Sequence, residues 1–425
     1  MELTQPASEV LEEQSDFRYR FYETLVLWSV LPWGRVPRMR PRISAWQRFL
    51  DDVSYLCDAD TGGKSVVSIA VQPGDQMLVF WISANARLGG ACQHLCWVLQ
   101  QLKKLHNGQT SAAETRVIIL EGTVNMSSPR VRNYVRALQL HLVQANALKP
   151  TTTEELLEVL WQLLAPRQQY AELSSRAYEF RSSVEYLNLK RIMRRSSRVS
   201  PWRSIRHYIG RLASWAKCTR FIVEMAQTCQ LLHEQHEVRP VRSARRMGWS
   251  KSAEAGEGLS VAMNRIVCGD DADLTQTFTA PDIQTMSKNF QARWESLNRR
   301  TIVHAEVTML DHFYRHDLTF VLGERYIGCS KPSCFCCDAY MSEHPLGVLR
   351  RPCHGNVWTK WSPPCDDELA KCALVALQEE LRRKISRGLS SSQYTARPRR
   401  RFDSVTDLSA SLPTIYDDWL GDTNM

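Results

Sequence analysis

No stretch of this sequence stays apolar for the roughly 18 to 20 residues that a membrane-spanning helix needs. The longest candidate, residues 65–84, is interrupted by Pro73, Gly74 and Asp75. The first residues also lack the basic and then apolar composition of a secretory signal peptide. We therefore expect no transmembrane segment and an intracellular location, either cytoplasmic or nuclear.

Acidic residues are missing from residues 190–220, which hold ten Lys or Arg side chains. Outside this basic segment, 44 basic residues face 45 acidic ones, so the segment accounts for the whole positive excess. Aromatic residues such as Trp202 and Trp215 lie among the charges, and basic groups near stacking surfaces suit a nucleic acid strand. A solvated helix face with buried tryptophans would give the same letters. The candidate nucleic-acid contacts are Arg194, Arg195, Arg198, Arg203 and Arg206.

The chain of 425 residues is 44% hydrophobic and 23% charged, which is typical of a globular protein. Its length allows two or three domains, or one domain with a long insertion. Seven of its 13 cysteines lie between positions 329 and 372. In a chain without a signal peptide, such clustering points to metal binding rather than to disulfide bonds.

Two β-branched and aromatic runs, residues 65–71 and 77–83, are joined by a Pro-Gly-Asp turn and predict a β-hairpin. From Gly89 to Arg300, apolar residues recur every three to four positions and predict helices. Residues 116–121 fit either a short buried strand or part of a helix. The predicted helices of this region cover residues 92–105, 129–148, 153–164, 170–193 and 208–236.

The last third of the chain alternates short elements. A buried stripe predicts a helix that begins near His304, and residues 334–344 predict a second short helix. Residues 320–328 and 353–361 are predicted as strands. Residues 366–384 form the clearest helix, because acidic residues at its start and basic residues at its end complement the helix dipole.

Two fragments in this region carry metal-binding chemistry: residues 304–306, His-Ala-Glu, and residues 330–337, Ser-Lys-Pro-Ser-Cys-Phe-Cys-Cys. If Cys334 opens a helix, Cys337 lies one turn later on the same side, and both sulfurs can reach one ion. Cys336 points elsewhere. His304 adds a neutral imidazole, and the three side chains predict a zinc site with an open fourth position for water.

Glu306 lies two residues after His304 and can reach this site if both sit in the irregular first turn of a helix. It would then act as a proton shuttle between the zinc-bound water and the leaving group. Zinc lowers the pKa of bound water to about 7, so hydroxide becomes available as the nucleophile at neutral pH. Two alternatives remain: a region without metal, and a closed zinc site with a fourth ligand from Cys329, Cys336, Cys353, His354 or Cys365.

The H-x-E fragment followed by a C-x-x-C pair resembles the signature of the cytidine/nucleotide deaminase superfamily. More narrowly, H-A-E and S-K-P-S-C-x-x-C look like a divergent fungal branch of nucleic acid or nucleotide deaminase-like proteins. The resemblance covers residues 301–360 and implies that His304, Cys334 and Cys337 hold zinc while Glu306 moves protons. One departure from the general signature is Ser333, which separates the proline from the first cysteine.

This resemblance implies an α/β fold, namely a cytidine-deaminase-like three-layer sandwich with a mixed central sheet, enlarged here by a long helical region. It also implies a zinc-dependent hydrolytic deaminase whose substrate is a nucleobase in a nucleoside, nucleotide or nucleic acid. The expected parts are an N-terminal helical and loop segment (1–60), a β-hairpin that starts the deaminase sheet (61–89), a helical insertion or helical domain (90–300), the zinc-binding core (301–388), and a disordered or loosely docked tail (389–425).

Three further residues are candidate substrate contacts. In the superfamily the second strand often ends near an asparagine that contacts the nucleoside, and Asn85 has a comparable place, although a simple turn asparagine is the alternative. His354 and Trp358 follow the zinc helix and are expected to line the pocket. Trp358 would stack on a base or, alternatively, pack in the core.

A second hypothesis of a different class is a non-catalytic, zinc-stabilised module that binds a partner or nucleic acid. The two hypotheses differ at the fourth coordination position, which a hydrolytic site keeps open and a structural site closes. A deaminase fold that has lost its activity is a third possibility.

Overall fold

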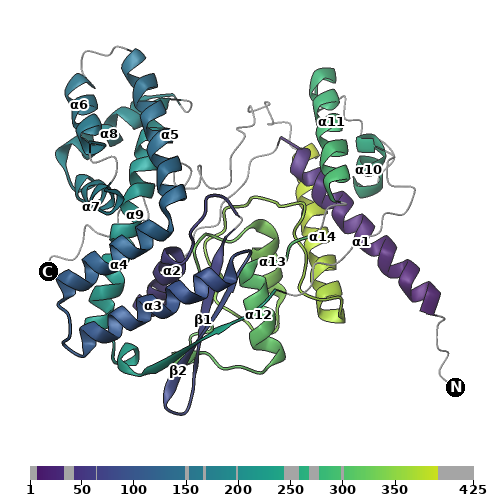
Figure 1. Cartoon of the computed structure of the whole chain (residues 1–425). Helices are drawn as coiled ribbons and strands as arrows, with labels where there is room; N and C mark the ends of the chain where they lie inside the picture. The colour runs from purple at the N-terminus through teal and green to yellow at the C-terminus, as the bar shows by residue number, and fades with distance from the viewer. Residues whose placement is uncertain are drawn as a thin grey trace. The chain divides into compact units, whose positions relative to one another are not determined.

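The computed structural model describes residues 7–32, 43–63, 65–148, 153–165, 169–197, 200–243, 258–267, 277–297 and 301–390. These residues fall into two units, and Figure 1 labels their α-helices and the strands β1 and β2. The first, which we call the bundle unit, consists of the described residues within 1–40, 243–311 and 332–401. The second, which we call the sheet unit, consists of those within 41–242 and 312–331. The tail predicted to be disordered or loosely docked lies, from residue 391 on, outside the described residues.

The sheet unit contains a mixed sheet, which has four strands among the described residues, in the order β3-β2-β1-β4. The predicted hairpin is confirmed, because β1 and β2 pair antiparallel and Gly74 N donates to Met77 O across the turn at 2.8 Å. Strand β3 lies parallel to β2, and β4 lies antiparallel to β1. The strands are β1 (Val67–Pro73), β2 (Met77–Ala84), β3 (Gln235–Pro240) and β4 (Gly328–Cys329).

The helices of the sheet unit surround one long central helix, α9, whose buried side chains include Ile205, Trp215 and Ile222. It packs against α2, α4, α5 and α7, so a single hydrophobic core joins these helices to the sheet. The helices are α2 (Ala45–Leu56), α3 (Leu88–His106), α4 (Ala112–Met126), α5 (Ser128–Ala147), α6 (Glu154–Leu163), α7 (Tyr170–Phe180), α8 (Val184–Arg195) and α9 (Pro201–Thr228).

Most helices predicted for residues 90–300 are present, with two differences. The prediction of one helix over 208–236 is wrong, because α9 ends at Thr228 and residues 235–240 form strand β3. The backbone groups of β3 are satisfied by β2, more than 150 residues earlier in the chain, which local periodicity does not report. The predicted helix 170–193 is two helices, since Ser183 caps α8 by accepting a hydrogen bond from Tyr186 N. Residues 116–121 are helical and belong to α4.

Both strands predicted in the last third are mostly irregular. In residues 320–328 the chain makes a 3-10 turn, η4 (Val321–Gly323), in which Leu322 has φ 58°, and only Gly328 enters a strand. Residues 353–361 make single bridges to two separate places, Ser333 with Cys353 and Ile302 with Trp361. Gly355, with φ 69°, bends the chain between these two bridges, and a continuous strand cannot form.

The bundle unit packs α1 against α10, α11 and α14, and α13 against α14. Its core contains fully buried aromatic side chains, among them Phe21, Trp361 and Tyr340. The predicted helix 366–384 is confirmed as α14. The helices are α1 (Ala7–Val30), α10 (Gly258–Val267), α11 (Ala280–Leu297), α13 (Phe335–Glu343) and α14 (Glu368–Ser390), and α12 (Ala305–Arg315) runs from this unit into the sheet unit.

The described part of the chain is therefore mostly helical with a small mixed sheet, which has the α/β character predicted from the sequence. None of the described helices is long and apolar enough to cross a membrane.

Candidate metal centre

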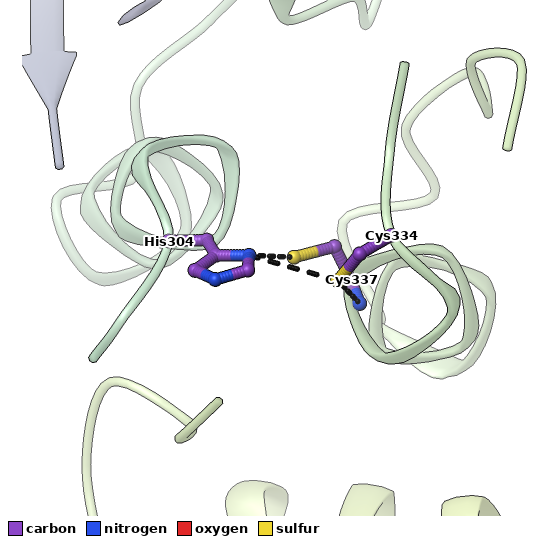
Figure 2. A group of neighbouring side chains, drawn as sticks. All are labelled: His304, Cys334 and Cys337. Carbon is purple, nitrogen blue, oxygen red and sulfur yellow. Dashed lines mark hydrogen bonds between the residues drawn. The ribbon is translucent and has the colours of Figure 1, made fainter. Parts of the chain in front are cut away.

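Two helix N-termini of the bundle unit bring the predicted ligands together (Figure 2). His304 directly precedes α12, and its carbonyl oxygen accepts the helix hydrogen bond from Thr308 N at 2.9 Å. Cys334 is the N-cap residue of α13, with φ −77° and ψ 168°, and its sulfur accepts a hydrogen bond from Cys337 N. Because an N-cap side chain folds back over the first helical turn, Cys334 and Cys337 present their sulfurs to the same point.

The three ligand atoms lie within 4.8 Å of one another. His304 Nδ1 is 3.2 Å from Cys337 Sγ and 3.6 Å from Cys334 Sγ. Both cysteines are buried, while His304 is partly accessible. Within the described residues, no fourth His, Cys, Asp or Glu joins this group. Three ligands without a fourth from the protein are typical of a hydrolytic zinc site rather than a structural one.

The electrostatics of the group distinguish Cys334 from the other two members. Burial opposes ionisation of Cys334, but hydrogen bonds from Cys336 and Cys337 outweigh it and, with the His304 imidazole, hold the pKa of Cys334 well below its usual value. Burial raises the pKa of Cys336 and of Cys337 well above the usual value of a thiol. Burial also disfavours charge on His304, but Cys334 and Glu306 raise the pKa of its imidazole.

Glu306 lies in the first turn of α12 and is 3% exposed. Its Oε2 atom has no hydrogen-bond partner among the described residues, although it is fully shielded from solvent. A buried carboxylate oxygen without a partner is costly, so it calls for a ligand or a water molecule beside it. A metal ion held by one imidazole and two thiolates, with a water in the fourth position, fits both the donor set and this orphaned oxygen.

The segment after α13 returns along the ligand-bearing backbone. His354 N donates to Ser333 O at 3.0 Å, and Phe335 N donates to Asn356 O at 2.9 Å, on either side of Cys334. The predicted contact residue His354 is buried, and its Nδ1 accepts a hydrogen bond from Asn356 N at 3.0 Å. Trp358 is half-buried. Both residues therefore lie in the segment that runs beside the backbone of Cys334.

Trp361 is a residue of this centre that the sequence did not suggest. Its Nε1 donates a hydrogen bond to Cys337 Sγ at 3.2 Å. Its backbone pairs with Ile302, two residues before His304, since Ile302 N donates to Lys360 O and Ser362 N donates to Ile302 O. Nothing in its local spacing marks it, because the partner is 24 residues away.

Ser330 and Lys331, which precede the cysteines in the motif, belong to the sheet unit. Ser330 Oγ donates to Asp58 Oδ2 at 3.0 Å, and Lys331 Nζ lies 3.0 Å from the same oxygen. Arg130, fully buried, donates from Nη1 to Asp58 O at 2.6 Å and faces the rings of Tyr55 and Trp215. Ser330 and Lys331 therefore anchor the start of the motif to the buried Asp58. Asp58 and Arg130 were not suggested by the sequence either.

Asn85, the third candidate substrate contact, belongs to the sheet unit and not to the metal group. It follows strand β2, and its side-chain amide donates to Gly63 O at 2.8 Å. Its contact with a substrate stays a prediction.

The residues of the basic segment differ in exposure. Arg194 and Arg195 are exposed in the last turn of α8, whereas Arg203 is half-buried and Arg206 is buried on α9. Arg198 lies outside the described residues. Trp202 and Trp215 are buried, at 3% and 0% exposure, so neither offers a free face for stacking on a base.

Residues 303–365 match the family model described as "OTT_1508_deam:-like deaminase". The matched residues contain the three ligands, Glu306 and Trp361. No curated protein and no solved structure matches the chain. The resemblance to the deaminase superfamily that the two sequence fragments indicated is confirmed by the family match and by the metal-binding geometry.

Proposed function

Because residues 303–365 form a deaminase-like domain of the cytidine deaminase-like superfamily, we propose that the protein is a zinc-dependent hydrolytic deaminase. Its substrate would be an amino-bearing nucleobase in a nucleoside, a nucleotide or a nucleic acid. The observation that carries this proposal is the buried, unpartnered carboxylate oxygen of Glu306 beside a three-ligand His-Cys-Cys group.

His304, Cys334 and Cys337 would hold the zinc ion. When bound, zinc activates a coordinated water molecule as the nucleophile at neutral pH. Glu306 would accept a proton from the attacking water at its orphaned Oε2 atom and deliver it to the exocyclic amine. The water oxygen becomes the ring carbonyl oxygen, the C–N bond breaks, and the amine leaves as ammonia.

The β1–β2 hairpin would form the first two strands of the central sheet in a three-layer deaminase sandwich. The described helices from 88 to 228 would be an enlargement of that fold. Asn85, His354 and Trp358 are the candidate substrate contacts. The exposed Arg194 and Arg195 keep nucleic acids among the candidate substrates, while the buried tryptophans of the basic segment give no support to base stacking there.

The decisive experiment is an ammonia-release screen with nucleosides, nucleotides, and single-stranded DNA and RNA. It compares the wild-type protein with Glu306→Gln, which preserves size, and with Glu343→Gln, an exposed glutamate at the end of α13, as the matched control. Loss of general acid-base catalysis costs about 10²- to 10⁴-fold in rate. We expect this loss for Glu306→Gln with zinc still bound, and no loss for Glu343→Gln. Zinc loss in Glu306→Gln would show that Glu306 is a ligand and contradict the assigned role.

A further inference from the structure

Trp361 makes a hydrogen bond to a metal ligand from outside both motifs. Its indole Nε1 lies 3.2 Å from Cys337 Sγ, and both residues are 0% exposed. Indole nitrogen is only a donor, so the direction of this bond is fixed from Trp361 to sulfur. A hydrogen bond from an outer partner to a metal ligand fixes the direction in which that ligand points.

The two cysteines obtain their N–H donors in different ways. Cys334 caps α13, and the backbone N–H of Cys337 reaches its sulfur at 3.4 Å as part of the cap geometry. Cys337 lies inside the first turn and cannot use that donor for its own sulfur. Trp361 supplies the donor that the helix cannot.

The backbone of Trp361 is held in place from two sides. One side is the pairing with Ile302, which places it next to the segment leading into His304. The other is helix α1, from which the Tyr22 hydroxyl donates to the carbonyl oxygen of Trp361 at 3.1 Å. The indole ring also packs near Tyr340 and Phe21, with ring centroids 5.8 and 6.4 Å away.

We propose that Trp361 is a positioning residue of the metal centre, which helix α1 holds so that its indole N–H donates to Cys337 Sγ and aligns this sulfur with His304. This inference rests on the proposed function only in taking zinc as the bound metal. Outer-sphere partners of this kind affect metal affinity by about 10- to 100-fold. Helix α1 would thus contribute to the centre, although Tyr22 and Trp361 are 339 residues apart in the chain.

The test uses Co²⁺ in place of Zn²⁺, because thiolate-to-cobalt charge transfer gives a near-ultraviolet absorption band that reports directly on the sulfur. Trp361→Phe removes the N–H donor and keeps an aromatic ring. We expect its band to move to longer wavelength and its metal affinity, measured by competition with a chelator, to fall about tenfold. Trp294→Phe is the control, since Trp294 is a buried tryptophan of the same unit that packs on Phe290.

If Trp361→Phe and Trp294→Phe show the same band and the same affinity, Trp361 only fills space and the inference is wrong. Should Trp361→Phe fail to fold, Tyr22→Phe, which removes a single hydroxyl, is expected to move the band in the same direction by less. An unmoved band in Tyr22→Phe would refute the role of α1. A protein that shows the band shift but releases no ammonia would keep this inference and refute the proposed reaction. A wild-type protein that takes up no Co²⁺ would refute both.

Discussion

Lys331 Nζ lies 3.0 Å from Oδ2 of Asp58 in the interior of the sheet unit, where the two side chains are 10% and 0% exposed. Arg130 also approaches Asp58, with Nη1 3.9 Å from Oδ2 and 2.6 Å from the backbone oxygen. One buried carboxylate therefore compensates two buried cations. Ser65 Oγ and Ser330 Oγ donate to its two oxygens and complete its hydrogen bonds.

Asp58→Asn would keep the shape of this anchor and remove its charge. Breaking a buried ion pair by removing one partner costs about 3–5 kcal/mol, because the remaining charge stays buried and uncompensated. We expect a loss of this size in the free energy of unfolding, measured by urea denaturation. The control is Asp60→Asn, whose partner Arg87 is 69% exposed, and an exposed pair contributes at most about 1 kcal/mol. Equal losses in the two variants would contradict the role given to Asp58.

Gly328 is required by the close approach of β4 to α2. A Cβ atom at this position would lie 2.5 Å from the backbone carbonyl carbon of Leu50, which is too close for any side chain. Gly328→Ala must push the strand away from the helix, and overpacking of this kind costs about 1–3 kcal/mol. Gly90→Ala is the control and should stabilise the protein. Nothing lies within 4 Å of its added Cβ atom, and alanine favours the helix over glycine by up to about 1 kcal/mol. Thermal unfolding of the two variants tests both signs.

The ligands of the metal centre could be predicted from the sequence because their arrangement is local. Cys334 and Cys337 are three residues apart, and capping by Cys334 alone brings their sulfurs together. His304 and Glu306 were predictable in the same way, from a helix that starts between them. These features need only helix geometry, which sequence spacing encodes.

The features that escaped prediction depend on contacts between distant segments. Asp58 meets Ser330 across 272 residues, and Trp361 meets Cys337 across 24. Strand β3 exists because β2 offers it hydrogen bonds. The strand predicted over 320–328 is interrupted by the 3-10 turn η4, and the one predicted over 353–361 is reduced to single bridges with two separate segments. The burial of Arg206 likewise follows from the packing of α9 and not from its charge pattern.

Adjacent cysteines should differ in their effect on metal content. Cys337 belongs to the three-ligand group, whereas Cys336 is buried beside it and does not join the group. We expect the wild-type protein to contain about one zinc ion per chain. A site left with two ligands binds zinc far more weakly, so Cys337→Ala should lose this ion. Cys336→Ala should retain it. Metal analysis of the purified variants by mass spectrometry measures both, and zinc loss in Cys336→Ala would mean that the ligand set is different.

His94 should make the stability of the sheet unit depend on pH. It is 8% exposed, its Nε2 lies 3.0 Å from Thr123 Oγ1, and burial lowers its pKa to about 4. The unfolded chain takes up a proton at this residue near pH 6.5, while the folded protein takes it up only near pH 4. The unfolded state therefore binds more protons between these values, and stability falls as the pH falls.

A single substitution separates the contribution of His94 from that of the other titrating groups. Between pH 7.5 and pH 5, His94 should remove about 2 kcal/mol from the free energy of unfolding. His94→Gln keeps a hydrogen-bonding group for Thr123 and cannot take up the proton. Urea denaturation at the two pH values should therefore show a loss smaller by about 2 kcal/mol in His94→Gln than in the wild-type protein. Parallel losses in the two proteins would show that His94 is protonated equally in the folded and unfolded states.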